Sequence, residues 1–330
     1  MKSMEVDTKP VLQLKNLQVK FYTQDGTVSA VEGLSLQVAA GQILGLVGES
    51  GCGKSTTALS IMRLLPKSSR IAGGEMLLDG ENILRLNERE MRKLRGSKVA
   101  MIFQDALSAL DPTMRVGQQI MEPLQTHLGL SKARARARTL ELLTTVGITQ
   151  PERRINQYTF EFSGGMRQRV MIAIALACNP RLLLADEPTT ALDVTVQRQI
   201  LNLLLKLRDL VDAGIILITH DVSVVSEVCD TVVVMYAGRE VEQGFTEEVF
   251  TQPRHPYTIG LLGSTLGAAA DRGKPLYAIP GLPPDLIHLP PGCPFAPRCP
   301  KATTLCSEKM PPIEQVSSKH SVACWHWNEE

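Results

Sequence analysis

An eight-residue segment, Gly48–Ser55, reads GESGCGKS and lies between an apolar run, Ile43–Val47, and a segment with helical spacing, Ser55–Leu65. Glycines at these positions let successive backbone N–H groups turn inward around phosphate oxygens, and the following helix directs its positive end at them. In such a loop the ammonium of Lys54 reaches the β- and γ-phosphates, and the hydroxyl of Ser55 binds Mg²⁺. The segment therefore predicts a strand, a phosphate-binding loop and a helix, the start of an α/β nucleotide-binding fold.

A second apolar run, Leu182–Ala185, ends in two carboxylates, Asp186 and Glu187. Asp186 can hold Mg²⁺ through its coordination shell, and Glu187 can orient and polarise an attacking water. A lone Asp-Glu pair at a strand end would be no more than two solvated acids. Because the same chain carries a phosphate loop, the pair instead favours a site that hydrolyses a nucleotide.

Polar residues also follow two other predicted strands and begin one predicted helix. Gln104 follows Val99–Phe103 and His220 follows Ile215–Thr219, where the carboxyl ends of parallel strands meet a ligand crevice. The segment Phe162–Gln168 places a serine and two glycines at a helix start, which is a further anion site. Each of these features alone is usually structural, so their order along the chain carries the functional argument.

Prolines and cysteines mark the boundary of a second region. Thirteen of the 20 prolines fall between Pro253 and Pro312, and four of the seven cysteines between Cys293 and Cys324. Such proline density prevents long helices and central strands. We therefore expect an α/β domain over residues 1–245, with an all-helical insertion at about 105–177, and a small extension over 246–330.

The composition, 44% hydrophobic and 21% charged, is that of a soluble globular chain. Thirty-five basic and 34 acidic residues leave a net charge of +1, which gives no electrostatic support for nucleic-acid binding. No apolar run approaches the roughly 20 residues that cross a bilayer, and the opening MKSMEVDTKP lacks the apolar core of a secretory signal. We expect a cytoplasmic protein with no nucleic-acid partner.

The order of the motifs, from the phosphate loop through Gln104, Ser-Gly-Gly, Asp-Glu and Thr190–Asp193 to His220, resembles the ATP-binding subunit of an ABC transporter over about Val11–Gly244. The resemblance implies an α/β, RecA-like P-loop NTPase core with a helical subdomain. It assigns catalysis to Glu187, His220 and Gln104, and Mg²⁺ to Ser55, Gln104 and Asp186. It assigns ATP contacts to Phe21, Gly48, Glu49, Ser50, Gly51, Cys52, Gly53, Lys54, Ser55, Thr56, Gln104, Ser163, Gly164, Gly165, Asp186 and Asp193. Met166 stands where the signature motif of the family often has glutamine, and Ala191–Asp193 matches its D-loop.

Other segments resemble the dipeptide, oligopeptide and nickel importer branch of that family, namely Val99–Asp105 with Leu110–Pro112, Met166–Ile172, Arg254–Thr258, and Gly292–Phe295 followed by Arg298–Pro300. The resemblance implies a head-to-tail ATPase dimer in which Ser163 and Gly165 complete the partner's ATP site. It also implies pairing with a second ATPase subunit, two permease subunits and an extracytoplasmic peptide-binding protein, at the cytoplasmic face of the bacterial inner membrane. A nickel or metallophore importer is the first alternative, and a soluble ABC ATPase acting on DNA or ribosomes is a distant one.

Four cysteines of the extension follow the spacing C-x5-C-x6-C-x17-C: Cys293, Cys299, Cys306 and Cys324. Four thiolates can complete a [4Fe–4S] cluster or a tetrahedral Zn²⁺ site, or they can be unliganded buried thiols. Zinc ribbons carry short C-x2–4-C knuckles that this sequence lacks, and the importer resemblance also implies the cluster. We expect ATP binding to be independent of this extension, because the predicted nucleotide fold ends before it.

Cys52 occupies a phosphate-loop position that needs no thiol. A helix N-terminus lowers the pKa of a nearby thiol, so the sequence predicts that Cys52 is more readily alkylated than Cys178 or Cys229. An inert small side chain that fills space is the alternative interpretation.

Overall fold

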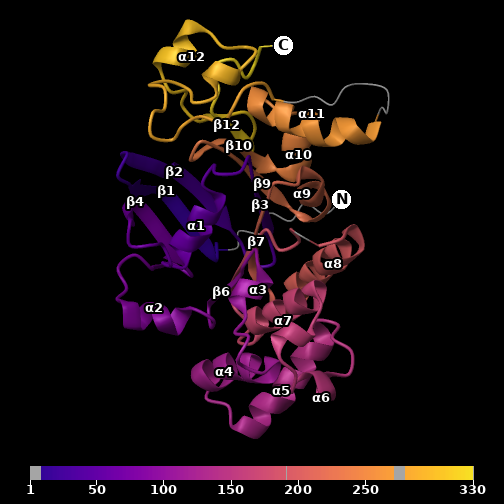
Figure 1. Cartoon of the computed structure of the whole chain (residues 1–330). Helices are drawn as coiled ribbons and strands as arrows, with labels where there is room; N and C mark the ends of the chain where they lie inside the picture. The colour runs from indigo at the N-terminus through magenta and orange to yellow at the C-terminus, as the bar shows by residue number, and fades with distance from the viewer. Residues whose placement is uncertain (1–8, 191, 271–278, 330) are drawn as a thin grey trace. The chain divides into compact units, whose positions relative to one another are not determined.

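The computed structural model describes residues 9–190, 192–270 and 279–329, and these form two compact units (Figure 1). Of the described residues, the first unit contains those up to Leu12, those of Val38–Gln42 and those of Ile83–Ile216. The second contains Gln13–Gln37, Ile43–Asn82 and the described residues from Leu217 onward. Strand β8, Gly214–Thr219, contributes residues to both.

The first unit is built on two parallel strands, β6 (Val99–Ile102) and β7 (Leu182–Asp186), with Ile102 opposite Ala185. Every residue of both strands is buried. The helices are α2 (Glu88–Leu94), α3 (Ala106–Ala109), α4 (Val116–Leu128), α5 (Lys132–Thr145), α6 (Pro151–Arg154), α7 (Gly164–Leu176) and α8 (Val194–Val211), with a 3-10 turn at Thr159–Glu161.

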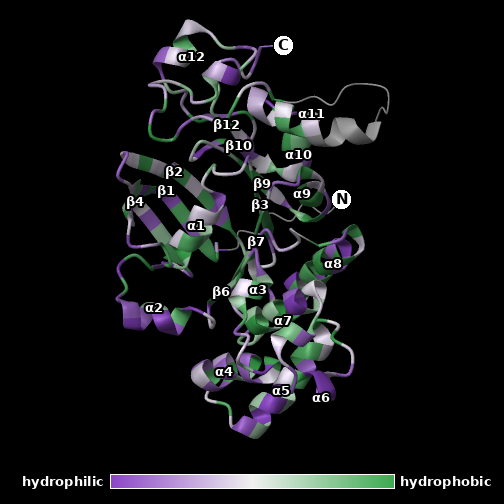
Figure 2. Ribbon diagram, viewed as in Figure 1, coloured by the Kyte–Doolittle hydropathy of each residue, from purple (hydrophilic) through white to green (hydrophobic). Residues whose placement is uncertain are grey.

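The secondary-structure elements between β6 and β7 are all helices, as the fading strand signal predicts. An isolated bridge joins Arg115 to Tyr158. Helices α4, α5 and α7 pack on one another. Figure 2 shows α2 and α6 mostly in purple, because their sequences, EREMRKL and PERR, are largely charged.

The second unit carries an antiparallel pair, β4 (Ser69–Leu78) and β5 (Glu81–Asn82), in a sheet of order β2-β1-β4-β5 with β1 (Leu12–Tyr22) and β2 (Thr27–Val38). Its other strands follow the order β11-β12-β10-β9-β3. They are β3 (Ile43–Val47), β9 (Thr231–Tyr236), β10 (Arg239–Phe245), β11 (Glu314–Gln315) and β12 (Ser321–Val322). Its helices are α1 (Lys54–Ile61), α9 (Val222–Val228), α10 (Thr246–Thr251), α11 (Pro256–Ala270) and α12 (Thr304–Glu308), with a 3-10 turn at Ala296–Arg298.

Strand β3 is the apolar run before the phosphate loop, and all five of its residues are buried. It pairs in parallel with β9, so that Val47 lies opposite Val234, and β10 continues the sheet antiparallel to β9. Helix α1 begins at Lys54 but ends at Ile61, earlier than the helical spacing to Leu65 predicts. Arg63 has a φ of +51°, which an α-helix cannot contain, and this residue ends the helical conformation.

The extension is tied to the same unit as the phosphate loop. Strand β12 pairs antiparallel with β10, with Val322 opposite Glu242. Glu242 is buried and accepts hydrogen bonds from the backbone N–H groups of Arg254 (2.7 Å) and His255 (3.0 Å), and it lies 2.8 Å from Nε2 of His320. The extension is thus tied to β10 by sheet pairing and by one buried carboxylate, and its helix α11, Pro256–Ala270, is longer than the proline density predicts.

Candidate functional site

The phosphate loop follows β3 in a conformation that requires glycine. Gly48 has a φ of +152°, and a Cβ there would lie 2.2 Å from the carbonyl oxygen of Met235. Gly53 has a φ of +105°, and its Cβ would lie 2.3 Å from the carbonyl oxygen of Ala30. No L side chain fits either position without moving the backbone. The glycines therefore serve both the turn and the close packing of the loop on β2 and β9.

Lys54 is the first residue of α1 and is almost fully buried. Its Nζ donates hydrogen bonds to the carbonyl oxygens of Gly48 (2.7 Å) and Glu49 (2.9 Å), so the ammonium is held inside the curve of the loop. Ser55 and Thr56 follow in the first turn, and Ser55 is exposed. A cation, a helix N-terminus and an exposed hydroxyl together favour a phosphate with its bound magnesium.

Cys52 does not behave as the sequence predicts. Cys52 is 5% exposed, and this burial raises the pKa of its thiol. The charge of Lys54, whose Nζ is 3.7 Å from Sγ, opposes the rise in pKa. The predicted lowering of this pKa is therefore wrong, but burial also raises the pKa of Cys178 and Cys229, so the order of reactivity among the three thiols stays a prediction. The helix N-terminus argument omits desolvation, which dominates for a thiol packed beneath the loop.

The acidic site lies at the end of β7. Asp186 is buried as the last residue of the strand, and Glu187 follows with a φ of +45°, a left-handed conformation that is rare for glutamate. Glu187 Oε2 accepts hydrogen bonds from Gln104 Nε2 and from Thr190 Oγ1, both at 2.9 Å. The structure thus brings together two of the residues that the sequence places in catalysis, Gln104 and Glu187.

The signature segment begins α7. Ser163 is its N-cap residue, and its hydroxyl accepts a hydrogen bond from the N–H of Met166 (3.4 Å). A Cβ on Gly165 would lie 2.7 Å from Cγ1 of Val196 in α8, so this glycine allows the two helices to approach closely. Ser163 and Gly164 are exposed, as residues that contact a ligand or a partner chain must be.

Asp193 is the N-cap residue of α8 and accepts a hydrogen bond from the N–H of Val196 (3.0 Å). Its carboxylate therefore has a structural role in this structure. Ala191, the first residue of the predicted D-loop, lies outside the described residues. Of the remaining predicted residues, Phe21 lies near the end of β1 and is partly exposed, and His220 directly follows β8 and is exposed.

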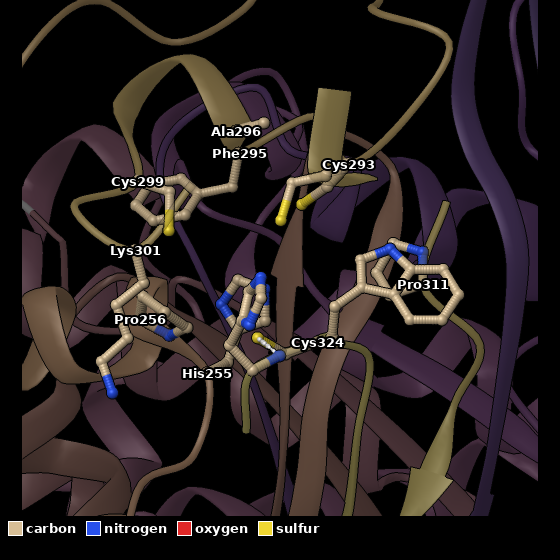
Figure 3. A pocket seen from close by; sticks show the side chains of 12 residues that line it. His255, Pro256, Cys293, Phe295, Ala296, Cys299, Lys301, Pro311 and Cys324 are labelled. Carbon is tan, nitrogen blue, oxygen red and sulfur yellow. Dashed lines mark hydrogen bonds between the residues drawn. The ribbon is translucent and has the colours of Figure 1, made fainter. Parts of the chain in front are cut away.

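The four cysteines of the extension line one pocket, together with His255, Pro256, Phe295, Ala296, Lys301, Pro311, Trp325 and His326. Figure 3 shows the sulfur atoms of Cys293, Cys299 and Cys324 around a common central space. The N–H of Cys293 donates to the carbonyl oxygen of Cys306 (2.7 Å), which joins the first and third cysteine segments. The four cysteines, which are spread over 32 residues of the sequence, therefore line the same pocket.

Burial, together with the charges of neighbouring thiols, raises the pKa of Cys293 and of Cys324 to about 11. Burial also acts on Cys306, but the Thr303 hydroxyl and His326 outweigh it and lower the pKa of this thiol. Among the residues that the structure describes, no three His, Cys, Asp or Glu side chains are grouped so as to hold a metal ion. The pocket gathers four thiols without the compact grouping that one ion requires.

One contact of the phosphate loop has no counterpart in the sequence analysis. Arg298 forms a bidentate ion pair with the carboxylate of Glu49, with N···O distances of 2.7 and 3.0 Å. Tyr257 accepts a hydrogen bond at its hydroxyl from the N–H of Glu49 (2.8 Å). No sequence spacing links residues this far apart, and an arginine in a proline-rich segment is usually solvated. The extension thus contacts the phosphate loop directly, although the predicted nucleotide fold ends before it.

Comparison with known proteins supports the motif argument. Residues 31–190 match the ABC transporter family, and residues 241–306 match the C-terminal region of oligopeptide/dipeptide transporters. The chain is 50% identical to the oligopeptide transport ATP-binding protein OppD of Escherichia coli, over 97% of this chain and 94% of that protein. It is 49% identical to the dipeptide transport ATP-binding protein DppD of Bacillus subtilis, over 96% of this chain and 94% of that protein.

A solved structure of a dimeric ATP-binding cassette, in a post-hydrolysis state bound to ADP and Pi, is similar with a TM-score of 0.64 and 29% identity. The similarity covers 71% of this chain and 98% of that one. In the described part of the chain, no helix combines the length and the apolar character needed to cross a membrane. The expected ABC ATPase fold is confirmed, and the chain belongs to the family of ATP-binding subunits of oligopeptide and dipeptide ABC transporters.

Proposed function

We propose that ATP is bound by the phosphate loop Gly48–Thr56 and hydrolysed with Glu187 as the residue that activates water. The chain is an ABC-type ATPase that energises import of oligopeptides and dipeptides. The observation that carries the residue assignment is the pair of hydrogen bonds that fixes the Glu187 carboxylate, from Gln104 and from Thr190. Two hydrogen-bond donors hold this carboxylate in one direction, as a base that must meet a water requires.

Each of the following side chains has one role in ATP binding or hydrolysis. Lys54 exchanges its hydrogen bonds with Gly48 and Glu49 for contacts to the β- and γ-phosphates. Glu187 accepts a proton from the attacking water, and His220 contacts the γ-phosphate. Phe21 stacks on adenine, and its partly exposed ring at the end of β1 supports that role.

Mg²⁺ would be held by Ser55, Gln104 and Asp186. The donor set fits, because hydroxyl, amide and carboxylate oxygens are the ligands that this hard cation prefers. When bound, Mg²⁺ neutralises charge that develops on the phosphates.

The signature segment completes a second subunit's site in this proposal. Ser163, Gly164 and Gly165 are available at the start of α7, where N–H groups and the helix dipole favour an anion. Asp193 would contribute through the helix start that it caps. The similar cassette that is a dimer with ADP and Pi supports this arrangement.

The assembly that we propose contains a second ABC ATPase subunit, two permease subunits and an extracytoplasmic peptide-binding protein, with this chain peripheral at the cytoplasmic face of the bacterial inner membrane. The match of residues 241–306 to a peptide-transporter region supports peptides over nickel or a metallophore as cargo.

The proposal for the extension is that Cys293, Cys299, Cys306 and Cys324 hold a [4Fe–4S] cluster. A single tetrahedral Zn²⁺ needs thiolates about 3.8 Å apart, given Zn–S bonds of about 2.3 Å. The four thiols line one pocket, and four thiolates are the ligand set of a [4Fe–4S] cluster, which is larger than a single ion. When bound, the cluster would cross-link a segment that has little core of its own.

Transport by the reconstituted complex tests the cargo. Proteoliposomes that contain the permeases and this ATPase pair, with ATP enclosed on the side of this subunit, should accumulate a labelled tripeptide when the peptide-binding protein is present outside. A complex with Lys54→Ala should not. Uptake of Ni²⁺ in place of peptide would support the nickel alternative instead.

A further inference from the structure

We propose that Arg298 of the extension is a positioning residue for the phosphate loop, and that it sets ATP affinity by fixing Glu49. The inference rests on the proposal that this loop binds ATP. It adds a contact from outside the motif, contributed by a residue 249 positions away in the chain.

The Arg298 side chain is 6% exposed, and Glu49 is the only carboxylate within ion-pair distance of its guanidinium among the described residues. Besides the bidentate pair, Nη1 donates to the hydroxyl of Tyr236 (3.2 Å) and Nε to the carbonyl oxygen of Pro280 (2.9 Å). Planar, bidentate pairs of this kind fix direction as well as distance. A buried guanidinium that lost Glu49 would keep an uncompensated charge.

Glu49 is held at three points. Its side chain pairs with Arg298, its N–H donates to the Tyr257 hydroxyl, and its carbonyl oxygen accepts from Lys54 Nζ (2.9 Å). The peptide groups that hold the loop lysine are thus anchored from outside the loop. The phosphate-loop pattern accepts any residue at position 49, so phosphate binding does not require the carboxylate of Glu49, which can pair with Arg298 instead.

The anchor belongs to the segment that supplies two of the pocket thiols. Arg298 ends the 3-10 turn Ala296–Arg298, which lies between Cys293 and Cys299. Just before this turn, Phe295 packs on Tyr236 and Tyr257, with ring centroids 5.1 and 5.4 Å apart. A rearrangement of the extension would therefore move the group that orients Glu49, and nucleotide binding and the extension would be coupled in both directions.

Arg298→Gln, in the assembled complex, tests the proposal by the dissociation constant for a fluorescent ATP analogue and by steady-state ATPase. We expect the dissociation constant and the KM to rise about tenfold, with kcat at saturating ATP nearly unchanged. Arg298→Lys should recover part of the affinity, because it keeps the charge and loses the fork. Lys309→Gln, an exposed cation of the same extension, is the matched control and should bind ATP as wild type does.

Glu49→Gln removes the same ion pair by a change in the phosphate loop, and the sequence of the extension stays that of the wild type. It should weaken ATP to a similar degree, and the double variant Glu49→Gln/Arg298→Gln should be no weaker than either single variant. Wild-type affinity in Glu49→Gln, or additive losses in the double variant, would overturn the proposal. Lys54→Ala, measured in parallel, tests separately whether the loop binds ATP at all. Unchanged ATP affinity in Lys54→Ala would mean that the loop itself is not the ATP site.

Discussion

Gln104 Nε2 donates a hydrogen bond to Glu187 Oε2 across 2.9 Å, although 83 residues separate them. The register of β6 and β7 explains the contact, because Ile102 lies opposite Ala185 and each residue of the pair lies two positions beyond these partners. A helical insertion can occupy the chain between the strands without disturbing their ends. The geometry at the carboxyl ends is therefore a property of the sheet.

Replacing Glu187 by glutamine should separate ATP binding from hydrolysis. The amide keeps the size of the side chain but cannot accept a proton from water, so kcat should fall by roughly 10²-fold or more. ATP affinity should stay close to wild type, since neither Lys54 nor the loop changes. Phosphate release measures kcat and equilibrium binding measures ATP affinity, and both are determined on the same complex.

Glu308→Gln is the matched control for that prediction, because it makes the same chemical change at an exposed position of α12. It should hydrolyse ATP at the wild-type rate. A wild-type rate in Glu187→Gln itself would show that another group activates the water.

The phosphate loop and its flanking elements could be predicted from the sequence because their determinants are local. An apolar run, glycines at Gly48 and Gly53, and a helix that starts at Lys54 all act within a few residues. The Gln104–Glu187 contact could be anticipated because both residues follow parallel strands. The predicted strands therefore located the edge of the first unit at which we propose catalysis.

The reactivity of Cys52 could not be predicted in this way, because burial depends on distant packing. With desolvation raising the pKa of its thiol, Cys52 should react with iodoacetamide at pH 7.5 at least about tenfold more slowly in the folded than in the urea-unfolded chain. Peptide mapping by mass spectrometry over time gives both rates. Equal rates in the two states would mean that the loop is open in solution.

Contacts over long sequence separations also could not be predicted from the sequence. The pairing of β12 with β10, the buried Glu242 with His320, and the Glu49–Arg298 pair each join the extension to residues upstream of residue 245. A charged side chain carries no local signal that it will be buried with a partner. The cysteine spacing showed that the four thiols meet, but not what else the same segment contacts.

Substitution of each pocket cysteine by serine should lower the iron content of anaerobically purified protein, from about four irons per chain in wild type. Serine is a poorer ligand than thiolate, so the absorption near roughly 400 nm should fall in parallel. Cys178→Ser, at a buried thiol outside the pocket, is the matched control and should keep its iron. One equivalent of zinc and no iron in the wild-type protein would contradict the cluster.

Glu240 gives the second unit a pH-dependent stability. It is 6% exposed on β10, and burial raises its pKa from 4.5 to about 7, against the opposing effect of a hydrogen bond from the N–H of Ser35 (3.2 Å). The folded state therefore binds this proton more tightly than the unfolded state. The resulting stabilisation is complete below pH 4.5 and is lost as the pH rises through about 7.

Glu240→Gln should remove that loss, because a neutral amide has no proton to release. Relative to wild type, the variant should gain roughly 2.5 kcal/mol of unfolding free energy between pH 5 and pH 8, the part of the effect that a rise in pKa from 4.5 to about 7 places in this range. Urea unfolding followed by tryptophan fluorescence measures this, since the only two tryptophans of the chain, Trp325 and Trp327, belong to the second unit. Glu81→Gln, at an exposed position of β5, should show the wild-type pH dependence. A constant difference between Glu240→Gln and wild type at both pH values would mean that Glu240 ionises in the folded protein as it does in the unfolded chain.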